Sequence, residues 1–298
     1  MRKPTDESTD SSAKSLRSTL ASHVYYGLRN FVHKKRWLLR GSQIVRGCWM
    51  YGPFRQHLIR YYQQRKANRP LVIDKRDLFP QLEIHPVVSK LIENGYAEGV
   101  TVPTEYLDQI VEYCENTGLK IYWNPHKECE AIDHIARNWK IVEIARQYLG
   151  IEPILWATQL KWSFGDGKQT PLGSRYVEPP EYDGHAFHFD RFDFKSLTLF
   201  IYLTDVDPSA GPHVVIEGTH AHKSVWELCH NILRDEAAQQ KFGNRIKSIL
   251  GPKGTMFFEE TSSYHKASRG KTERLILSIH FVLQRRPPPE RPTLPAAA

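Results

Sequence analysis

The chain has 298 residues and a mass of 34.6 kDa, which suits one large domain with appended segments. A hydrophobic share of 40%, a negative mean hydropathy and the lack of an apolar run of about 18 residues argue against a transmembrane helix. The four cysteines have no CxxC spacing and the N-terminus has no apolar leader. We therefore expect reduced thiols and a cytoplasmic location.

The net charge of +8 is unevenly distributed along the chain. Between Ser11 and Ile73 there are 13 Lys or Arg and no Asp or Glu, whereas residues 74–298 contain 26 basic and 30 acidic side chains. This contrast predicts a basic, aromatic and partly disordered segment (1–73), a catalytic body (74–286) and a disordered, Pro-rich tail (287–298).

The basic segment allows three interpretations. Its aromatic residues at helical spacing favour helices that pack on the body and leave a solvated basic face. A second interpretation is peripheral binding to an anionic membrane surface or to an acidic carrier. Nucleic acid is the least favoured partner, because interleaved aromatic and basic residues without a recognisable module are a weak signal.

The pattern changes from helices to strands near residue 150. Helical periodicity covers 87–92, 106–114 and 139–149, with Gly95, Gly118 and Gly150 as expected stops. Short apolar runs follow at 156–164, 197–203, 213–216, 255–258 and 275–283, and residues 225–242 read as an inserted helix. Strands with turn signals between them predict a mainly β jelly roll with flanking helices.

Candidate metal ligands begin with His188-x-Asp190. On a strand, residues i and i+2 share a face, so both side chains can reach one ion. One His and one carboxylate make two-thirds of the facial triad that binds Fe(II). His265 is a third candidate, and Arg274 opens the apolar run nine residues later. A buried guanidinium needs an anionic partner and suits bidentate capture of a small carboxylate.

These motifs resemble those of the phytanoyl-CoA dioxygenase family. The matching features are His-x-Asp, a turn with Gly, an apolar strand ending in Gly218-Thr219-His220, and a distal His followed by an Arg. The resemblance covers about residues 85–284 and is strongest in 184–220 and 251–283. It implies a double-stranded β-helix (the cupin-like jelly roll) and an oxygenase that uses Fe(II), 2-oxoglutarate and O₂.

The same resemblance implies roles for individual residues. His188, Asp190 and His265 would bind iron, and Arg274 would bind the distal carboxylate of 2-oxoglutarate. The reaction would oxidise a C–H bond of a small-molecule substrate, with release of succinate and CO₂. Related halogenases have a small residue in place of this carboxylate, so Asp190 favours hydroxylation or another halide-free oxidation.

Other polar residues have weaker predicted roles. Lys161 and Thr198, on expected strands, are candidate co-substrate contacts, and Gln169 and Arg191 are candidate substrate contacts. The remaining histidines of interest are predicted to be non-ligands: His185, His213, His220 and His280.

Two other functional classes remain open. The same ligands could hold Zn²⁺ for a hydrolase, which would leave Arg274 without a role. A non-catalytic jelly roll that only binds a partner is the other alternative. Consumption of 2-oxoglutarate separates an oxygenase from both. A basic segment would suit an anionic substrate such as an acyl-CoA or a carrier-bound acyl group.

Overall fold

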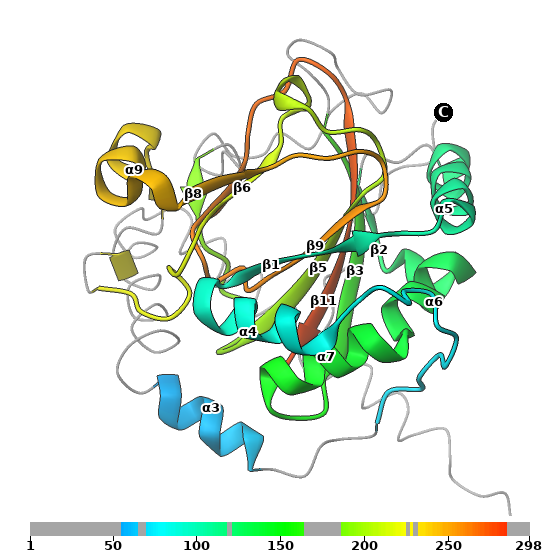
Figure 1. Cartoon of the computed structure of the whole chain (residues 1–298), viewed down its shortest axis with the longest axis horizontal. Helices are drawn as coiled ribbons and strands as arrows, with labels where there is room; N and C mark the ends of the chain where they lie inside the picture. The colour runs from blue at the N-terminus through cyan, green and yellow to red at the C-terminus, as the bar shows by residue number, and fades with distance from the viewer. Residues whose placement is uncertain are drawn as a thin grey trace, which may run out of the picture.

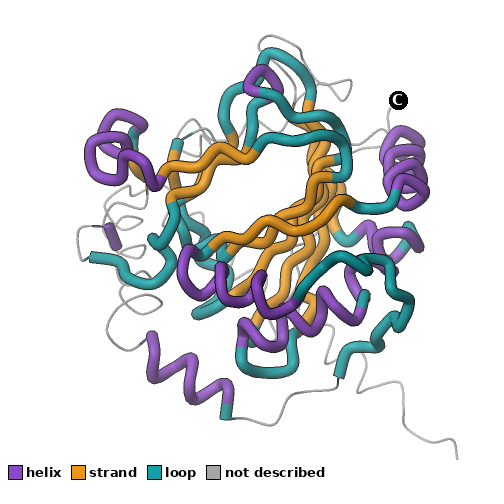
Figure 2. The backbone as a smooth tube through the Cα atoms, viewed as in Figure 1, coloured by secondary structure: helices purple, strands orange, loops and turns teal. Residues whose placement is uncertain are grey.

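The computed structural model describes residues 55–64, 70–117, 121–163, 186–224, 227–228 and 232–284. Predictions for residues 1–54 and 285–298, and for Gln169 and His185, lie outside these ranges. Within them, two antiparallel sheets face each other as a jelly roll (Figures 1 and 2).

The six-stranded sheet has the order β1 (Tyr96–Thr101), β9 (Thr255–Glu259), β5 (Ser196–Tyr202), β11 (Arg274–Val282), β3 (Ile154–Ser163) and β2 (Ile121–Trp123). The five-stranded sheet has the order β7 (Ile232–Leu233), β4 (Phe187–His188), β10 (His265–Ala267), β6 (His213–Ile216) and β8 (Ile246–Ile249). The five apolar runs predicted as strands correspond to β3, β5, β6, β9 and β11, so the predicted jelly roll is confirmed.

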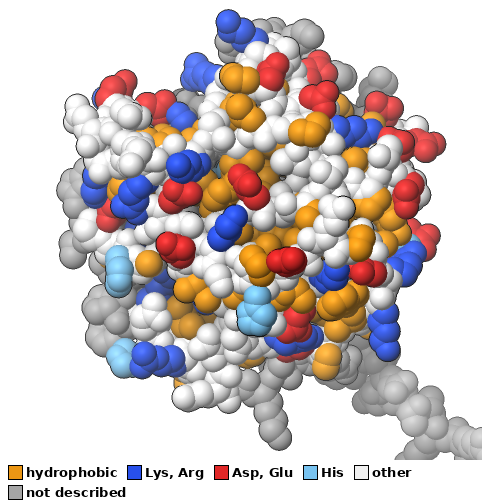
Figure 3. Space-filling model, viewed as in Figure 1, with side chains coloured by type: hydrophobic (Ala, Val, Ile, Leu, Met, Phe, Trp, Pro, Cys, Tyr) orange, Lys and Arg blue, Asp and Glu red, His pale blue; other side chains and the backbone are white. Residues whose placement is uncertain are grey.

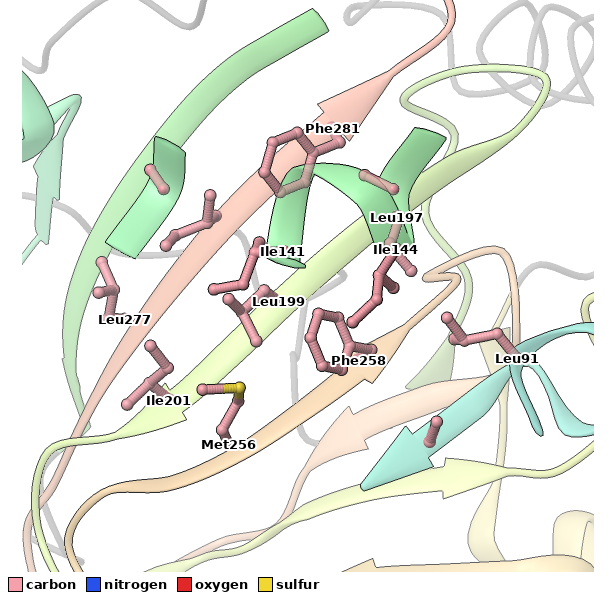
Figure 4. Close-up of a cluster of buried hydrophobic side chains, with 14 of the residues drawn as sticks. Leu91, Ile141, Ile144, Leu197, Leu199, Ile201, Met256, Phe258, Leu277 and Phe281 are labelled. Carbon is pink, nitrogen blue, oxygen red and sulfur yellow. The ribbon is translucent and has the colours of Figure 1, made fainter. Parts of the chain in front are cut away.

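Helices cover the outer face of the larger sheet. These are α4 (Ile84–Asn94), α6 (Glu130–Arg137) and α7 (Trp139–Leu149), while α5 (Thr104–Thr117) lies beside β2 (Figure 1). Ile141 and Ile144 of α7 pack on the apolar side chains of β5, β9 and β11 (Figure 4). Because side chains alternate across a strand, Leu275, Leu277 and the other odd-numbered residues of β11 to Phe281 face the helices. The even-numbered ones face the barrel interior.

The three predicted helices of the first half form where expected. Their ends follow from the backbone freedom of glycine: Gly95 and Gly150 adopt φ of 73° and 72°, and their N–H groups close the last turns of α4 and α7. Gly118 lies outside the described ranges. Cys114 and Cys129 are free and buried, as predicted for reduced thiols.

Two predictions from periodicity were incomplete. The region expected to be rich in helix also contains β1 and β2, because a half-buried edge strand and a three-residue strand carry too few apolar positions to be recognised. The inserted helix expected at 225–242 was wrong in its extent. Among its described residues, 227–228 are helical, the short strand β7 pairs with β4, and α9 (Asp235–Phe242) follows, so the segment is not one continuous helix.

Part of the basic segment packs on the body. Helix α3 (Arg55–Gln63) buries Ile59 and Arg55, whereas Arg60 is exposed. The predicted boundary at residue 73 stays a prediction. In the face shown in Figure 3, acidic and basic side chains are interspersed. No helix among the described residues is both long and apolar enough to cross a membrane.

Candidate metal centre

The two predicted histidine ligands lie on neighbouring strands of the smaller sheet. His188 of β4 is directly opposite His265 of β10, and their ring centroids are 4.6 Å apart. Asp190 Oδ2 lies 3.7 Å from His265 Nε2. One ligand atom from each of the three residues lies within 4.8 Å of the others. The fold therefore brings together residues that are 77 positions apart in the chain.

Hydrogen bonds orient both imidazole rings in the same way. Nδ1 of His188 lies 3.0 Å from the carbonyl oxygen of Ala186, and Nδ1 of His265 lies 3.0 Å from that of Ser263. A carbonyl oxygen can only accept, so each Nδ1 carries a hydrogen, and in the neutral ring Nε2 then keeps the lone pair. This tautomer is the one needed for metal binding through Nε2.

Asp190 differs from the prediction in its local structure. Strand β4 ends at His188, so the carboxylate lies just beyond the strand. The backbone N–H of Asp190 donates to the carbonyl of Thr261 at 2.8 Å, which fixes the chain next to the segment that leads into His265. This backbone hydrogen bond therefore positions Asp190 beside the segment that carries His265. The i, i+2 alternation of a strand does not align Asp190 with His188.

Burial sets the electrostatics of His265 and Asp190. Burial lowers the pKa of His265 to about 3, so its imidazole is neutral at ordinary pH. Burial also raises the pKa of Asp190, although His188 and His280 act in the opposite direction. A cation bound among these groups would lower the pKa of Asp190 and so oppose the effect of burial.

Arg274 begins β11, as predicted, and is only 3% exposed. Its Nη1 donates to the carbonyl of Gly211, and Ser163 Oγ lies 3.5 Å from its Nη2. Its Nε is buried without a hydrogen-bond partner. Within the described ranges no carboxylate forms an ion pair with this guanidinium, which is the situation expected of a binding group for a carboxylate ligand.

The predicted co-substrate contacts both face the interior. Lys161 is directly opposite Ile276, on the same face of the sheet as Arg274. Thr198 is fully buried and its hydroxyl lies 3.1 Å from His280 Nδ1. His280 Nε2 lies 3.0 Å from Ser278 Oγ; burial lowers the pKa of His280 to about 4, while the charge of Asp190 acts in the opposite direction. His280, predicted to be a core or surface histidine, thus lies in the interior next to the metal centre.

Two interior residues were not predicted as part of the site. Glu259 of β9 is fully buried, and its Oε2 lies 2.6 Å from His213 Nε2. Its Oε1 lies 3.4 Å from His265 Nδ1 but has no hydrogen-bond partner. Burial raises the pKa of Glu259 to about 8. The sequence signal was the pair Glu259-Glu260 after an apolar run, since adjacent carboxylates at a strand end project to opposite faces.

The other predicted residues lie around the centre. His220 connects elements of the fold: Ile92 O lies 3.2 Å from its Nε2, and its own carbonyl accepts from Arg55. Arg191 lies over the ring of Phe189, with 5.2 Å between its Cζ and the ring centroid.

A cavity of about 790 Å³ opens between the sheet edges β1 and β8. Its lining includes Tyr96, Glu98, Lys247 and Phe257. None of the six residues predicted for metal or co-substrate lines it. Phe257 connects it to the interior, because its ring lies 5.3 Å from that of His213.

Comparison with known proteins gives one sequence relative and several similar structures. A protein from Stutzerimonas stutzeri named "Probable alpha-ketoglutarate-dependent hypophosphite dioxygenase" is 28% identical over 152 residues, or 48% of this chain and 49% of that protein. The match therefore spans about half of the relative's length. No family model matches the chain.

Among solved structures, EctD from S. alaskensis in its apoform has a TM-score of 0.50 at 15% identity, covering 78% of this chain and 92% of EctD. EctD with 2-oxoglutarate and 5-hydroxyectoine has a TM-score of 0.49 at 14% identity, covering 76% and 91%. The likeness to apo EctD supports the fold, and the fold by itself does not specify a substrate.

Proposed function

We propose that the protein is an Fe(II)- and 2-oxoglutarate-dependent dioxygenase. The observation that carries this proposal is the meeting of two Nε2-directed imidazoles and one carboxylate, in the same interior, with a buried guanidinium that has no carboxylate partner among the described residues. The named activity of the Stutzerimonas stutzeri relative belongs to the same class. Membership of the phytanoyl-CoA dioxygenase family stays a proposal that rests on the motifs.

The donor atoms fit a ferrous ion. Two neutral imidazoles and a carboxylate are the facial triad that leaves ligand positions open for substrate and O₂. His188, Asp190 and His265 would hold the ion, with the hydrogens on Nδ1 kept by the carbonyls of Ala186 and Ser263. When bound, iron supplies the redox chemistry that couples decarboxylation of 2-oxoglutarate to oxidation of the substrate.

The protein's own residues would bind and orient the co-substrate. Arg274 offers the orphaned Nε and a desolvated positive charge, which strengthens its attraction for a carboxylate. Lys161 and Thr198 stay proposed as further contacts. The apolar side chains on both sheets exclude water, so that an oxidant formed there would not be quenched by solvent.

The substrate is proposed at a coarser level. We propose hydroxylation of a C–H bond in a small molecule. An anionic substrate, such as an acyl-CoA, a carrier-bound acyl group or another anionic metabolite, is motivated by the 13 basic residues between Ser11 and Ile73. Contact of that segment with an anionic membrane or an acidic carrier, and a cytoplasmic location, stay predictions. Hypophosphite, the compound in the relative's name, belongs in the first panel of substrates tested.

The decisive experiment is an anaerobic titration of the protein with Fe(II) and then with 2-oxoglutarate, monitored by visible absorption. A charge-transfer band from a chelated keto acid is expected in the wild type. Asp190→Ala should lose the band through loss of metal, and Arg274→Ala should weaken 2-oxoglutarate binding while retaining metal. A folded wild-type protein that binds metal without giving the band would refute the oxygenase proposal and favour a hydrolase or a binding protein.

A further inference from the structure

His213 and Glu259 form a buried polar pair in the described interior that the proposed reaction leaves without a role. Their side chains are 6% and 0% exposed, and the 2.6 Å contact between Nε2 and Oε2 joins them. A fully buried carboxylate and imidazole cost free energy through desolvation. An apolar pair at these positions would serve the packing of the barrel equally well, so the polar pair calls for a functional explanation.

His213 lies between the metal centre and Arg274. Its ring is nearly parallel to that of His265, at 16° and a centroid distance of 5.4 Å. On the other side, Arg274 donates to the carbonyl of Gly211, two residues before His213. The positive charge of Arg274 also acts on the imidazole of His213. A ligand that extends from the metal centre to Arg274 would therefore meet His213.

The surroundings fix the ring of His213 and leave one polar atom available. Phe200 and Phe257 pack against the ring at 4.9 and 5.3 Å, and the backbone N–H of His213 donates to the hydroxyl of Tyr202 at 3.0 Å. Nε2 is held by Glu259. Nδ1 has no hydrogen-bond partner among the described residues, so it is the atom that can meet a ligand.

We propose that His213, held by Glu259, is a second binding residue, beside Arg274, for the distal carboxylate of the co-substrate. In the tautomer with its hydrogen on Nδ1, the ring of His213 can donate to that carboxylate, and the hydrogen in the contact between Nε2 and Oε2 then belongs to the carboxyl group of Glu259. Glu259 acts as a positioning residue, since its side-chain polar contacts among the described residues are with His213 and His265. This inference rests on the proposed function, because it presumes a dicarboxylate oxo acid.

The test compares two oxo acids of equal length. 2-Oxoglutarate has the distal carboxylate, and 2-oxopentanoate has a methyl group in its place. Their affinities are measured by calorimetry with the Fe(II)-loaded full chain under anaerobic conditions, for wild type and for His213→Leu. His222→Leu is the matched control, because His222 is exposed. His213→Leu should weaken the binding of 2-oxoglutarate by roughly 10- to 100-fold, as expected for the loss of a hydrogen bond to a charged group. The affinity for 2-oxopentanoate should not change.

Each outcome has a distinct meaning. Equal weakening of both oxo acids would show that His213 only supports the pocket, and unchanged binding of both would show that it makes no contact; either result overturns the inference. If His213→Leu does not fold, as judged by metal binding, His213→Met, which also lacks a hydrogen-bond donor, is used under the same criterion. A wild type that binds metal but neither oxo acid would refute the proposed function itself.

Discussion

Arg55 Nη2 lies 2.7 Å from Glu260 Oε1, and both side chains are almost completely buried. The same guanidinium donates to the carbonyls of Phe194 and His220 at 2.7 and 2.6 Å, and Tyr148 donates its hydroxyl to Glu260 Oε2. Helix α3 is thereby joined to the segment between β9 and β10 that leads into His265. Glu260 therefore contacts residues on the outer side of the sheet, whereas the adjacent Glu259 contacts residues in the interior.

Replacing Arg55 with Ala should destabilise the protein by about 3–5 kcal/mol, because the carboxylate of Glu260 would remain buried without its cation. Urea unfolding of the full chain measures the difference. Arg60→Ala, on the exposed side of the same helix, is the control and should change stability by less than about 0.5 kcal/mol. Equal effects of the two substitutions would mean that α3 is not anchored through this ion pair.

The stability deficit of Arg55→Ala should depend on pH. Although burial alone would raise it, Arg55 and other donors hold the pKa of Glu260 below the ordinary value of 4.5. A depressed pKa contributes stability above that value, and this contribution is lost as the pH falls through the folded-state pKa. In Arg55→Ala the neutral acid is favoured, so the difference between wild type and variant should shrink below pH 4.5. Unfolding at pH 7 and pH 4 tests this, and a constant difference would contradict it.

Metal binding should stabilise the wild type and fail in ligand variants. A metal concentration of about 100 Kd contributes about 2.7 kcal/mol, seen as a higher Tm. We expect His188→Ala and His265→Ala to lose this increase in Tm. Loss of a ligand should weaken metal binding by at least ~10–100-fold, which is the loss of affinity caused by removing an outer contact to a metal site. His222→Ala should keep it. A full increase in His188→Ala would remove that residue from the ligand set.

Gly95 should not tolerate a side chain. Its φ of 73° disfavours L-residues by about 1–2 kcal/mol, and a Cβ there would lie 2.4 Å from His220 Nδ1 and 2.6 Å from Ser263 Oγ. Overpacking adds about 1–3 kcal/mol. Gly150→Ala is the matched control, because Gly150 has the same left-handed conformation but its added Cβ would meet only the flexible side chain of Gln63. Thermal unfolding should give Gly95→Ala a lower Tm than Gly150→Ala; the reverse order would show that the ring of His220 moves aside freely.

The sequence by itself determined five of the strands (β3, β5, β6, β9 and β11), the helices α4, α5 and α7, and the identity of the candidate ligands. Apolar runs such as 197–203 and 275–283 have to be buried, and glycines such as Gly95 mark helix ends through backbone freedom. His188, Asp190, His265 and Arg274 stood out because metal and carboxylate chemistry requires those residue types. All these signals depend on local pattern or on side-chain chemistry, which the sequence states directly.

The tertiary structure alone decided which residues meet. Pairing of β4 with β10 brings His188 opposite His265, and no local pattern encodes a contact between strands so far apart in the chain. The same holds for His213 and Glu259, which look like ordinary polar residues until β6 and β9 face each other across the interior. Short edge strands were missed because pairing with neighbours, more than their own apolar content, stabilises them.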